Sequence, residues 1–330
     1  MSARKVLWHD SYASNIKVVM TDAEWPKYVD SIINYATTNS YDAVSLSAIG
    51  ASVAKQSSLQ PDELGFLPDS QTAYKYINQF IAEAEKAGLQ VGLNVYQKIA
   101  LPDDKSVTDT VDQLASEIAK NIVHTKPLII GIDGEDNKLK ENTTRTPTEF
   151  ATRWMNSLDK YGVNYDTFAI LGGNKQESIW SQHPKFENVY EYYSEDGWAG
   201  DFNHNIGVIL KNNPQGALNY IQSQMASGAV QNPKDPVTGQ YSGIVPAFSI
   251  GTGDGTNTLG QHANKKPIGP AVFGTWKSDE FNKFIDLFES TYPSIENIFV
   301  YHADQLPLAW IPSSSSQSAN ELMLAANGLI

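Results

Sequence analysis

The feature that most constrains this chain is a regular alternation along its length. Short runs rich in Val, Ile, Phe and Tyr are separated by longer segments with helical periodicity, which predicts repeated βα units around a parallel sheet. Eight strands are the number found in a TIM barrel, so the sequence predicts an α/β fold, a single (β/α)8 barrel, with residues 1–330 as one domain. The expected strands are residues 5–10, 42–50, 89–96, 127–134, 165–173, 186–193, 242–251 and 295–302.

Helices are expected between these strands, with boundaries set by capping residues. One of them begins at Asp69 and ends at Gly88, as an N-cap and a C-terminal glycine predict. Two alternatives are an open doubly wound sheet and two smaller α/β domains. No Gly-rich phosphate loop follows the first strand, which argues against a dinucleotide-binding sheet. The expected helices are 21–38, 69–88, 106–124, 146–162, 213–228, 277–292 and 316–328, with a weaker one at 174–184.

Charge and cysteine content exclude several classes of function. The formal net charge of -13 leaves no basic stripe for a nucleic acid or an anionic membrane surface. The chain has no cysteine, and therefore no disulfide and no thiolate zinc site or nucleophile. The first residues lack the apolar core of a signal peptide, and no apolar run is long enough to span a bilayer. A soluble chain is predicted, secreted after processing or cytoplasmic, with its oligomeric state left open.

Two connections are expected to be longer than the others. They follow the sixth and seventh strands, at residues 194–215 and 251–276, on the side of the sheet where barrel enzymes build their sites. Trp198, in the first of them, is expected to line or cover the mouth of the barrel. Ordinary loop packing is the alternative for this residue.

The stretch "KPLIIGIDGEDN", residues 126–137, carries the most informative polar residues. Side chains two apart on a strand share a face, so Asp133 and Glu135 are expected to lie on the same face as Gly131. Both side chains are then expected to point into the mouth of the barrel. Two neighbouring carboxylates resist double ionisation, which raises one pKa and provides the general acid that a glycosidase requires. The structural alternative is a salt bridge from Lys98 or Lys126 to one of them.

Other strand ends add aromatic and hydroxyl groups to the same rim. Aromatic planes match the C–H faces of sugar rings, and polar side chains match their hydroxyls, so we expect a glycan or oligosaccharide ligand. The alternative is that these residues form the upper core layer of a barrel of any function. The expected ligand-contacting residues, besides Trp198, are Trp8, Asp10, Asn94, Tyr96, Tyr190, Tyr192, Tyr301 and His302.

No metal or other cofactor is predicted. The chain has neither H-x-H nor H-E-x-x-H, and its six histidines are scattered. Convergence of His9, Asp10, Asp133 and His302 on a metal is a weaker alternative. The glycine-rich "SIGTGDGTN" after the seventh strand could hold a phosphate, but it is also ordinary turn chemistry.

The layout resembles the family 18 glycoside hydrolases, which include chitinases, endo-β-N-acetylglucosaminidases and inactive chitinase-like proteins. Their D-x-x-D-x-D-x-E motif aligns with Leu128, Gly131, Asp133 and Glu135, so the final D-x-E is present and the first two aspartates are not. Their M-x-Y-D/N pattern falls on residues 190–193 and keeps the tyrosine, Tyr192. The S-x-G-G of their third strand is missing from "GLNVYQK".

The resemblance implies a retaining mechanism on N-acetylglucosamine-containing glycans. Glu135 would be the proton donor, Asp133 would orient the nucleophilic 2-acetamido group of the substrate, and Tyr192 would hydrogen-bond that group. The missing aspartates leave a second hypothesis open: a non-catalytic carbohydrate-binding, storage, inhibitor or toxin-associated barrel.

Overall fold

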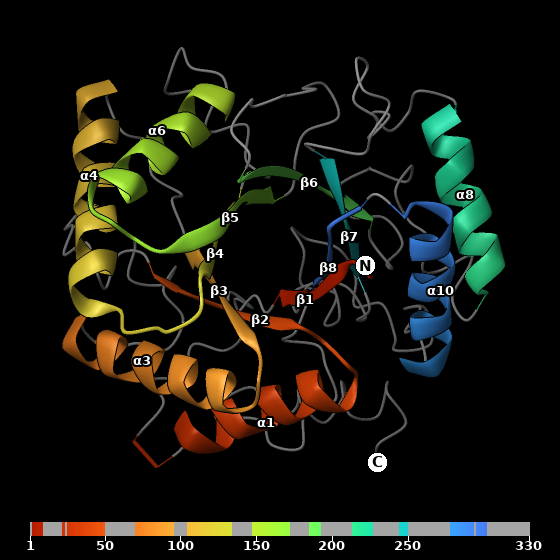
Figure 1. Cartoon of the computed structure of the whole chain (residues 1–330), viewed down its shortest axis with the longest axis horizontal. Helices are drawn as coiled ribbons and strands as arrows, with labels where there is room; N and C mark the ends of the chain where they lie inside the picture. Colours follow the sequence, from red (N-terminus) through yellow and green to blue (C-terminus); the bar gives the residue numbers. More distant parts are fainter. Residues whose placement is uncertain are drawn as a thin grey trace, which may run out of the picture.

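Eight parallel strands form one closed barrel in chain order, β1 to β8, in a computed structural model (Figure 1). The structure describes residues 2–8, 22–23, 25–49, 70–95, 104–133, 147–171, 185–192, 213–226, 244–249, 278–293 and 295–301. The predicted (β/α)8 barrel is confirmed. The strands are β1 (Arg4–Trp8), β2 (Ala43–Ile49), β3 (Gln90–Val95), β4 (Leu128–Asp133), β5 (Tyr165–Leu171), β6 (Phe186–Tyr192), β7 (Ile244–Ser249) and β8 (Asn297–Tyr301).

Pairing between the first and the last strand closes the barrel. It runs in register from Arg4 opposite Asn297 to Trp8 opposite Tyr301. All neighbouring pairs are parallel, so the carboxyl ends of all eight strands lie at one rim and their amino ends at the other.

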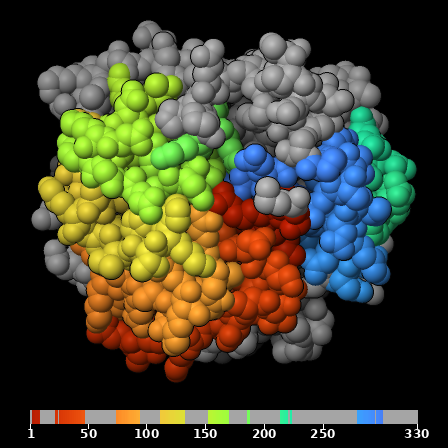
Figure 2. All heavy atoms as spheres, viewed as in Figure 1, coloured from red at the N-terminus to blue at the C-terminus, as the bar shows by residue number. Residues whose placement is uncertain are grey.

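Helices surround the barrel and cover its outer face. Successive βα units lie side by side in chain order, from α1 in orange-red through α3, α4 and α6 (Figure 2). Each helix buries one apolar stripe, as Phe281, Phe284 and Phe288 of α10 illustrate. The expected helices at 174–184 and 316–328 lie outside the described residues. The described helices are α1 (Trp25–Thr38), α3 (Ser70–Lys86), α4 (Asp104–Asn121), α6 (Pro147–Lys160), α8 (Pro214–Ala226) and α10 (Ser278–Thr291).

Glycine ends two of these helices. Gly88 follows α3 with φ 88°, and the amide of Leu89 donates to the carbonyl of Ala84 at 2.9 Å. Gly162 follows α6 with φ 70° in the same arrangement. A left-handed residue after a helix lets the chain satisfy its last carbonyls and turn into the next strand, and glycine reaches that conformation without strain.

The buried residues form two cores separated by the sheet. The larger core fills the space between strands and helices and includes Leu7, Ile130 and Phe168. The smaller one fills the barrel interior with Val6, Trp8, Ala43, Ile129, Ala169 and Phe299. Alternate residues of a strand enter the two cores, so each strand has an inner and an outer parity.

The strand and helix bounds also set the lengths of the connections. Residues 193–213 separate β6 from α8 and residues 250–277 separate β7 from α10, as expected for the two longer connections. Residues 50–69, between β2 and α3, make a third one that the sequence pattern did not single out. Among the described helices, none combines the length and apolar character needed to cross a membrane.

Candidate functional site at the carboxyl ends of the strands

The carboxyl-terminal rim of the barrel gathers several of the predicted site positions. Trp8 ends β1, Asp133 ends β4, Tyr192 ends β6 and Tyr301 ends β8, while Asn94 is the last residue but one of β3. Their strands are therefore arranged around one opening, as the sequence predicts. Asp10, Tyr96, Glu135, Trp198 and His302 lie outside the described residues, and their predicted roles remain predictions.

Trp8 is the predicted site residue whose side chain the structure describes in full. Its indole is completely buried in the barrel interior and meets Phe299 with ring centroids 5.5 Å apart at 59°. Trp8 therefore forms part of the inner core at the level of the rim. Within the described part of the chain, its buried Nε1–H has no hydrogen-bond acceptor.

Two glycines make room for this indole on the opposite side of the barrel. A Cβ atom on Gly131 of β4 would stand 2.5 Å from Cζ2 of Trp8. A Cβ atom on Gly92 of β3 would stand 3.1 Å from Cζ3 of the same ring and 2.9 Å from Cβ of Ser45. Trp8 thus reaches across the interior from β1 to β3 and β4, and it fills the barrel directly beneath the rim.

Strand parity places three of the rim positions on the inner face. Ile129 lies in the inner core, and a side chain at position 131 would point at Trp8. Position 133 is two residues further along the strand and therefore has inner parity as well. In β3, Gly92 faces Trp8 in the same way, which gives Asn94 inner parity. Phe299 of the inner core gives inner parity to Tyr301.

On the sixth strand, strand parity places the two tyrosine positions on the outer face of the sheet. Phe186 packs in the outer core, whereas Glu187 bonds to Asn297 inside the barrel. Counting in twos, Tyr190 and Tyr192 share the outer parity of Phe186, and Glu191 has inner parity. Their pairing with β7 is regular up to Tyr192 opposite Phe248. The role predicted for Tyr192 remains a prediction, and Glu191 is the acidic position that the sequence motif did not select.

One of the two lysines considered as partners of the acidic pair is engaged elsewhere. Lys126 donates its Nζ hydrogen to the carbonyl of Gly88, at the amino end of β4. It therefore lies at the opposite end of the strand from Asp133. Lys98, the other lysine, is outside the described residues.

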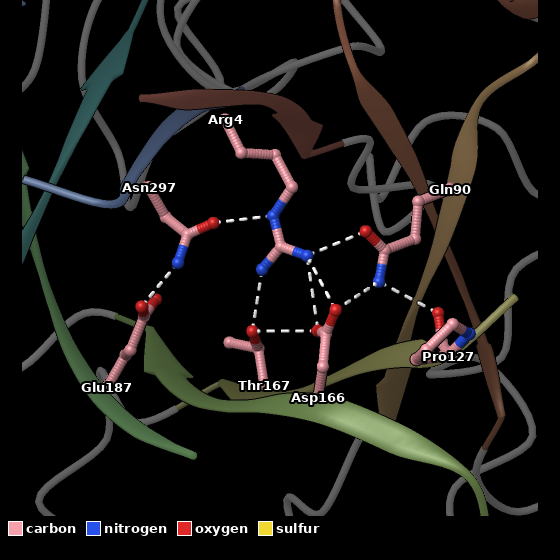
Figure 3. A network of polar contacts seen from close by, with 7 residues as sticks. All are labelled: Arg4, Gln90, Pro127, Asp166, Thr167, Glu187 and Asn297. Atoms are coloured by element: carbon pink, nitrogen blue, oxygen red, sulfur yellow. Dashed lines mark hydrogen bonds and ion pairs between the residues drawn. The ribbon is translucent and has the colours of Figure 1, made fainter. Parts of the chain in front are cut away.

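A second polar cluster, at the amino ends of the strands, was missed by sequence reasoning (Figure 3). Its members begin or nearly begin their strands, and they are Arg4, Gln90, Thr167, Glu187 and Asn297. The available signal was parity: Arg4 is two residues before Val6, and Asn297 is two before Phe299, both of which are apolar inner residues.

The described residues give neither a metal-binding group nor a hollow at the rim. In the ranges that the structure describes, no three His, Asp or Glu residues are grouped so as to hold a metal ion. A hollow of about 640 Å³ lies on the outer surface between α8 and α10, where Gln215, Lys283 and Asp286 line it. Its place between helices separates it from the rim.

Comparison with known proteins gives structural likenesses alone. No model of a protein family matches the chain, and no curated protein matches it. Similar solved structures include Thermotoga maritima Cel5A in complex with mannotriose, with 12% identity over 99% of this chain and 97% of that chain and a TM-score of 0.49. Thermobifida fusca endoglucanase Cel5A in complex with cellotetraose is 11% identical over 99% of this chain and 91% of that chain, with a TM-score of 0.46. Bacteroides uniformis beta-glucuronidase 2 is 11% identical over 91% of this chain and 30% of that chain, with a TM-score of 0.49.

These likenesses decide neither reaction nor substrate, because identity is 11–12% and every one of these TM-scores is below 0.5. The chain is a (β/α)8 barrel protein on its own strand pairing. The resemblance to family 18 has no matching family model behind it and stays a prediction.

Proposed function

We propose that this barrel is a retaining glycosidase that acts on N-acetylglucosamine-containing glycans at the carboxyl-terminal rim of its strands. The observation that carries the proposal is the position of Asp133. Asp133 is the last residue of β4 and has inner parity, two residues after Gly131, which contacts the buried Trp8. Glu135 follows two residues later in the sequence. Catalytic groups of barrel enzymes occur at this end of the strands.

The chemistry follows from placing two acidic residues close together over an apolar floor. A buried indole lowers the local dielectric, and a neighbouring carboxylate disfavours ionisation, so one carboxyl group keeps its proton near neutral pH. In this proposal Glu135 gives that proton to the glycosidic oxygen as the C–O bond breaks. The substrate's acetamido oxygen attacks the anomeric carbon, and Asp133 orients the acetamido group. Water then opens the cyclic intermediate and returns a proton to Glu135.

Binding of the sugar rings is assigned to the rest of the rim. Asn94 and Tyr301 have inner parity beside Asp133 and are proposed to meet ligand hydroxyls. Trp8 was expected to contact the ligand, but it is completely buried in the inner core, so its proposed role is to support the rim residues from beneath. Asp10, Tyr96, Trp198 and His302 are proposed as further contacts from the connections that follow the strands.

The sixth strand supplies the remaining contact to the acetamido group. The family 18 resemblance assigns it to Tyr192, whereas strand parity favours Glu191 for a group that faces the mouth. We assign the contact to this pair of adjacent residues, and the variants described in the Discussion distinguish them.

The test is hydrolysis of a panel of chitooligosaccharides and N-glycans by the wild type and by Glu135→Gln. A matched control is Glu83→Gln, which removes an acid 3.1 Å from Lys86 on the outer helix α3. We expect turnover by the wild type and the control, and a loss of about a hundredfold or more in Glu135→Gln. Equal turnover by all three proteins would refute the assignment of Glu135.

A non-catalytic barrel is the second candidate, and the loss of the first two motif aspartates at Leu128 and Gly131 favours it. It predicts no turnover of any glycan in the panel by any of the proteins. Calorimetry with chitohexaose then separates its forms: heat of binding supports a carbohydrate-binding protein, and its absence points to a storage, inhibitor or toxin-associated role.

A further inference from the structure

The amino-terminal end of the barrel is closed by a hydrogen-bonded network that draws on five strands (Figure 3). Its members come from β1, β3, β5, β6 and β8, up to 293 residues apart in the chain. At its centre is one cation, Arg4, and at its edge is one half-buried acid, Glu187, whose Oε2 atom is enclosed. The members are Arg4, Gln90, Asp166, Thr167, Glu187 and Asn297.

Arg4 directs all the hydrogen bonds of its guanidinium away from that acid. Nη1 donates to Gln90 at 2.6 Å and to Asp166 at 2.9 Å. Nη2 donates to Thr167 at 2.6 Å, and Nε donates to Oδ1 of Asn297 at 2.5 Å. The charge of Arg4 is therefore balanced by Asp166, and in the described part of the chain its guanidinium donates no hydrogen bond to Glu187.

Among the residues that the structure describes, Glu187 accepts a single hydrogen bond. The Nδ2 group of Asn297 donates to its Oε1 atom. Its Oε2 atom is buried, and within the described part of the chain it has no hydrogen-bond partner. An ionised carboxylate needs donors on both oxygens when it is removed from water, whereas a protonated one carries its own hydrogen on the second oxygen. The bonding around Glu187 therefore fits the neutral acid better than the anion.

The charged groups around Glu187 do not compensate for its burial. Arg4 of β1 favours the anion, but Asp166 of β5 and Glu296, just before β8, oppose it. Burial is the largest effect and raises the pKa of Glu187 to about 7, against the smaller lowering effects of the Asn297 hydrogen bond and of Arg4.

We propose that Glu187 is an enclosed proton-binding site at the base of the barrel, and that release of this proton destabilises the folded barrel. The proton sits on Oε2. Its loss leaves a negative charge that has one donor among the described residues and is opposed by the charges of Glu296 and Asp166. This site is independent of the proposed glycosidase function, because it lies at the opposite end of the strands.

The sign of the pH effect follows from the direction of the shift. The pKa of Glu187 in the folded chain lies above its ordinary value of 4.5, so the proton binds more tightly to the folded protein. The stabilisation is fully present below about pH 4.5 and is lost as the pH rises through about 7. We expect this group alone to raise the unfolding equilibrium constant on the order of fiftyfold between about pH 5 and pH 8.

The experiment compares urea unfolding of the wild type and Glu187→Gln from about pH 5 to pH 8. Glutamine copies the shape and neutrality of the protonated acid, so its unfolding should lack the fiftyfold component, while Glu83→Gln should keep the wild-type profile. Parallel pH profiles for the wild type and Glu187→Gln would overturn the proposal.

A second measurement does not require the variant to fold. Carbon-13 NMR of side-chain carboxyl groups in the wild type, and in Glu135→Gln to remove the proposed catalytic acid, follows each glutamate through its titration. A glutamate signal with a midpoint near neutral pH in both proteins supports an enclosed proton at Glu187. Titration of all glutamate signals near their ordinary pKa in Glu135→Gln would overturn it.

Discussion

Cζ2 of Trp8, on β1, lies 2.5 Å from the point at which a Cβ atom of Gly131, on β4, would stand. The two residues are 123 positions apart in sequence, and the indole of one occupies the side-chain space of the other. The glycine at position 131 leaves the space that this ring occupies. This pair forms the base beneath the proposed site.

Gly131→Ala is expected to destabilise the protein, because the new methyl group overlaps the buried ring. We expect a loss of about 1–3 kcal/mol in the free energy of unfolding, measured by urea denaturation. The second-site control is Trp8→Phe, whose smaller ring vacates the space beside Gly131. In the double variant the methyl group fills that space, so the combined loss should be smaller than the sum of the two single losses. Additive losses would show that the two side chains do not meet.

Asp112→Asn tests a contact between the neighbouring helices α4 and α6. Asp112 accepts hydrogen bonds from Lys160 at 2.7 Å and from Ser157 at 2.5 Å, and these bonds hold the pKa of its carboxyl below the ordinary value. A lowered pKa means that the stabilisation is present above about pH 4 and is lost as the carboxyl is protonated.

We therefore expect Asp112→Asn to cost about 0.5–1 kcal/mol at neutral pH, reduced by solvent screening of Lys160, and close to nothing at about pH 3. Urea denaturation at both pH values measures the difference. Glu83→Gln, which breaks an exposed pair with Lys86, should cost less at neutral pH. An unchanged cost of Asp112→Asn in acid would assign the effect to packing.

Glu191→Gln and Tyr192→Phe distinguish the two candidates on the sixth strand. Because strand parity gives Glu191 the face of Glu187, we expect Glu191→Gln to lower kcat by about tenfold or more. Tyr192→Phe should change kcat and KM by about threefold or less if the strand keeps its alternation to its last residue. A larger loss in Tyr192→Phe would show that the chain leaves this alternation at residue 192, as the family 18 resemblance requires.

Local pattern was sufficient to predict the fold. The expected strand at 127–134 is observed as Leu128–Asp133, and the expected helix at 69–88 as Ser70–Lys86, since both carry their boundaries in adjacent residues. The length and composition of "PLIIGIDG" define a buried strand without knowledge of its neighbours.

Contacts between distant strands could not be predicted in this way. The burial of Trp8 depends on Gly92 and Gly131. These glycines belong to two other strands, and the sequence around Trp8 does not indicate that they lie next to it. Arg4 lies just before the first expected strand, and the sequence pattern does not indicate that it contacts Asp166 and Asn297, which lie in two other expected strands. These side chains meet through the closed arrangement of the strands, which no single segment of the sequence defines.

The most direct test of the proposed mechanism compares two substrates with Glu135→Gln. A chitooligosaccharide needs a proton on its leaving oxygen, whereas a dinitrophenyl glycoside of N-acetylglucosamine leaves without one. We expect the variant to lose about a hundredfold or more in kcat/KM on the first substrate and to stay near wild type on the second. Equal losses on both substrates, or no loss on either, would contradict the role of Glu135 as the proton donor.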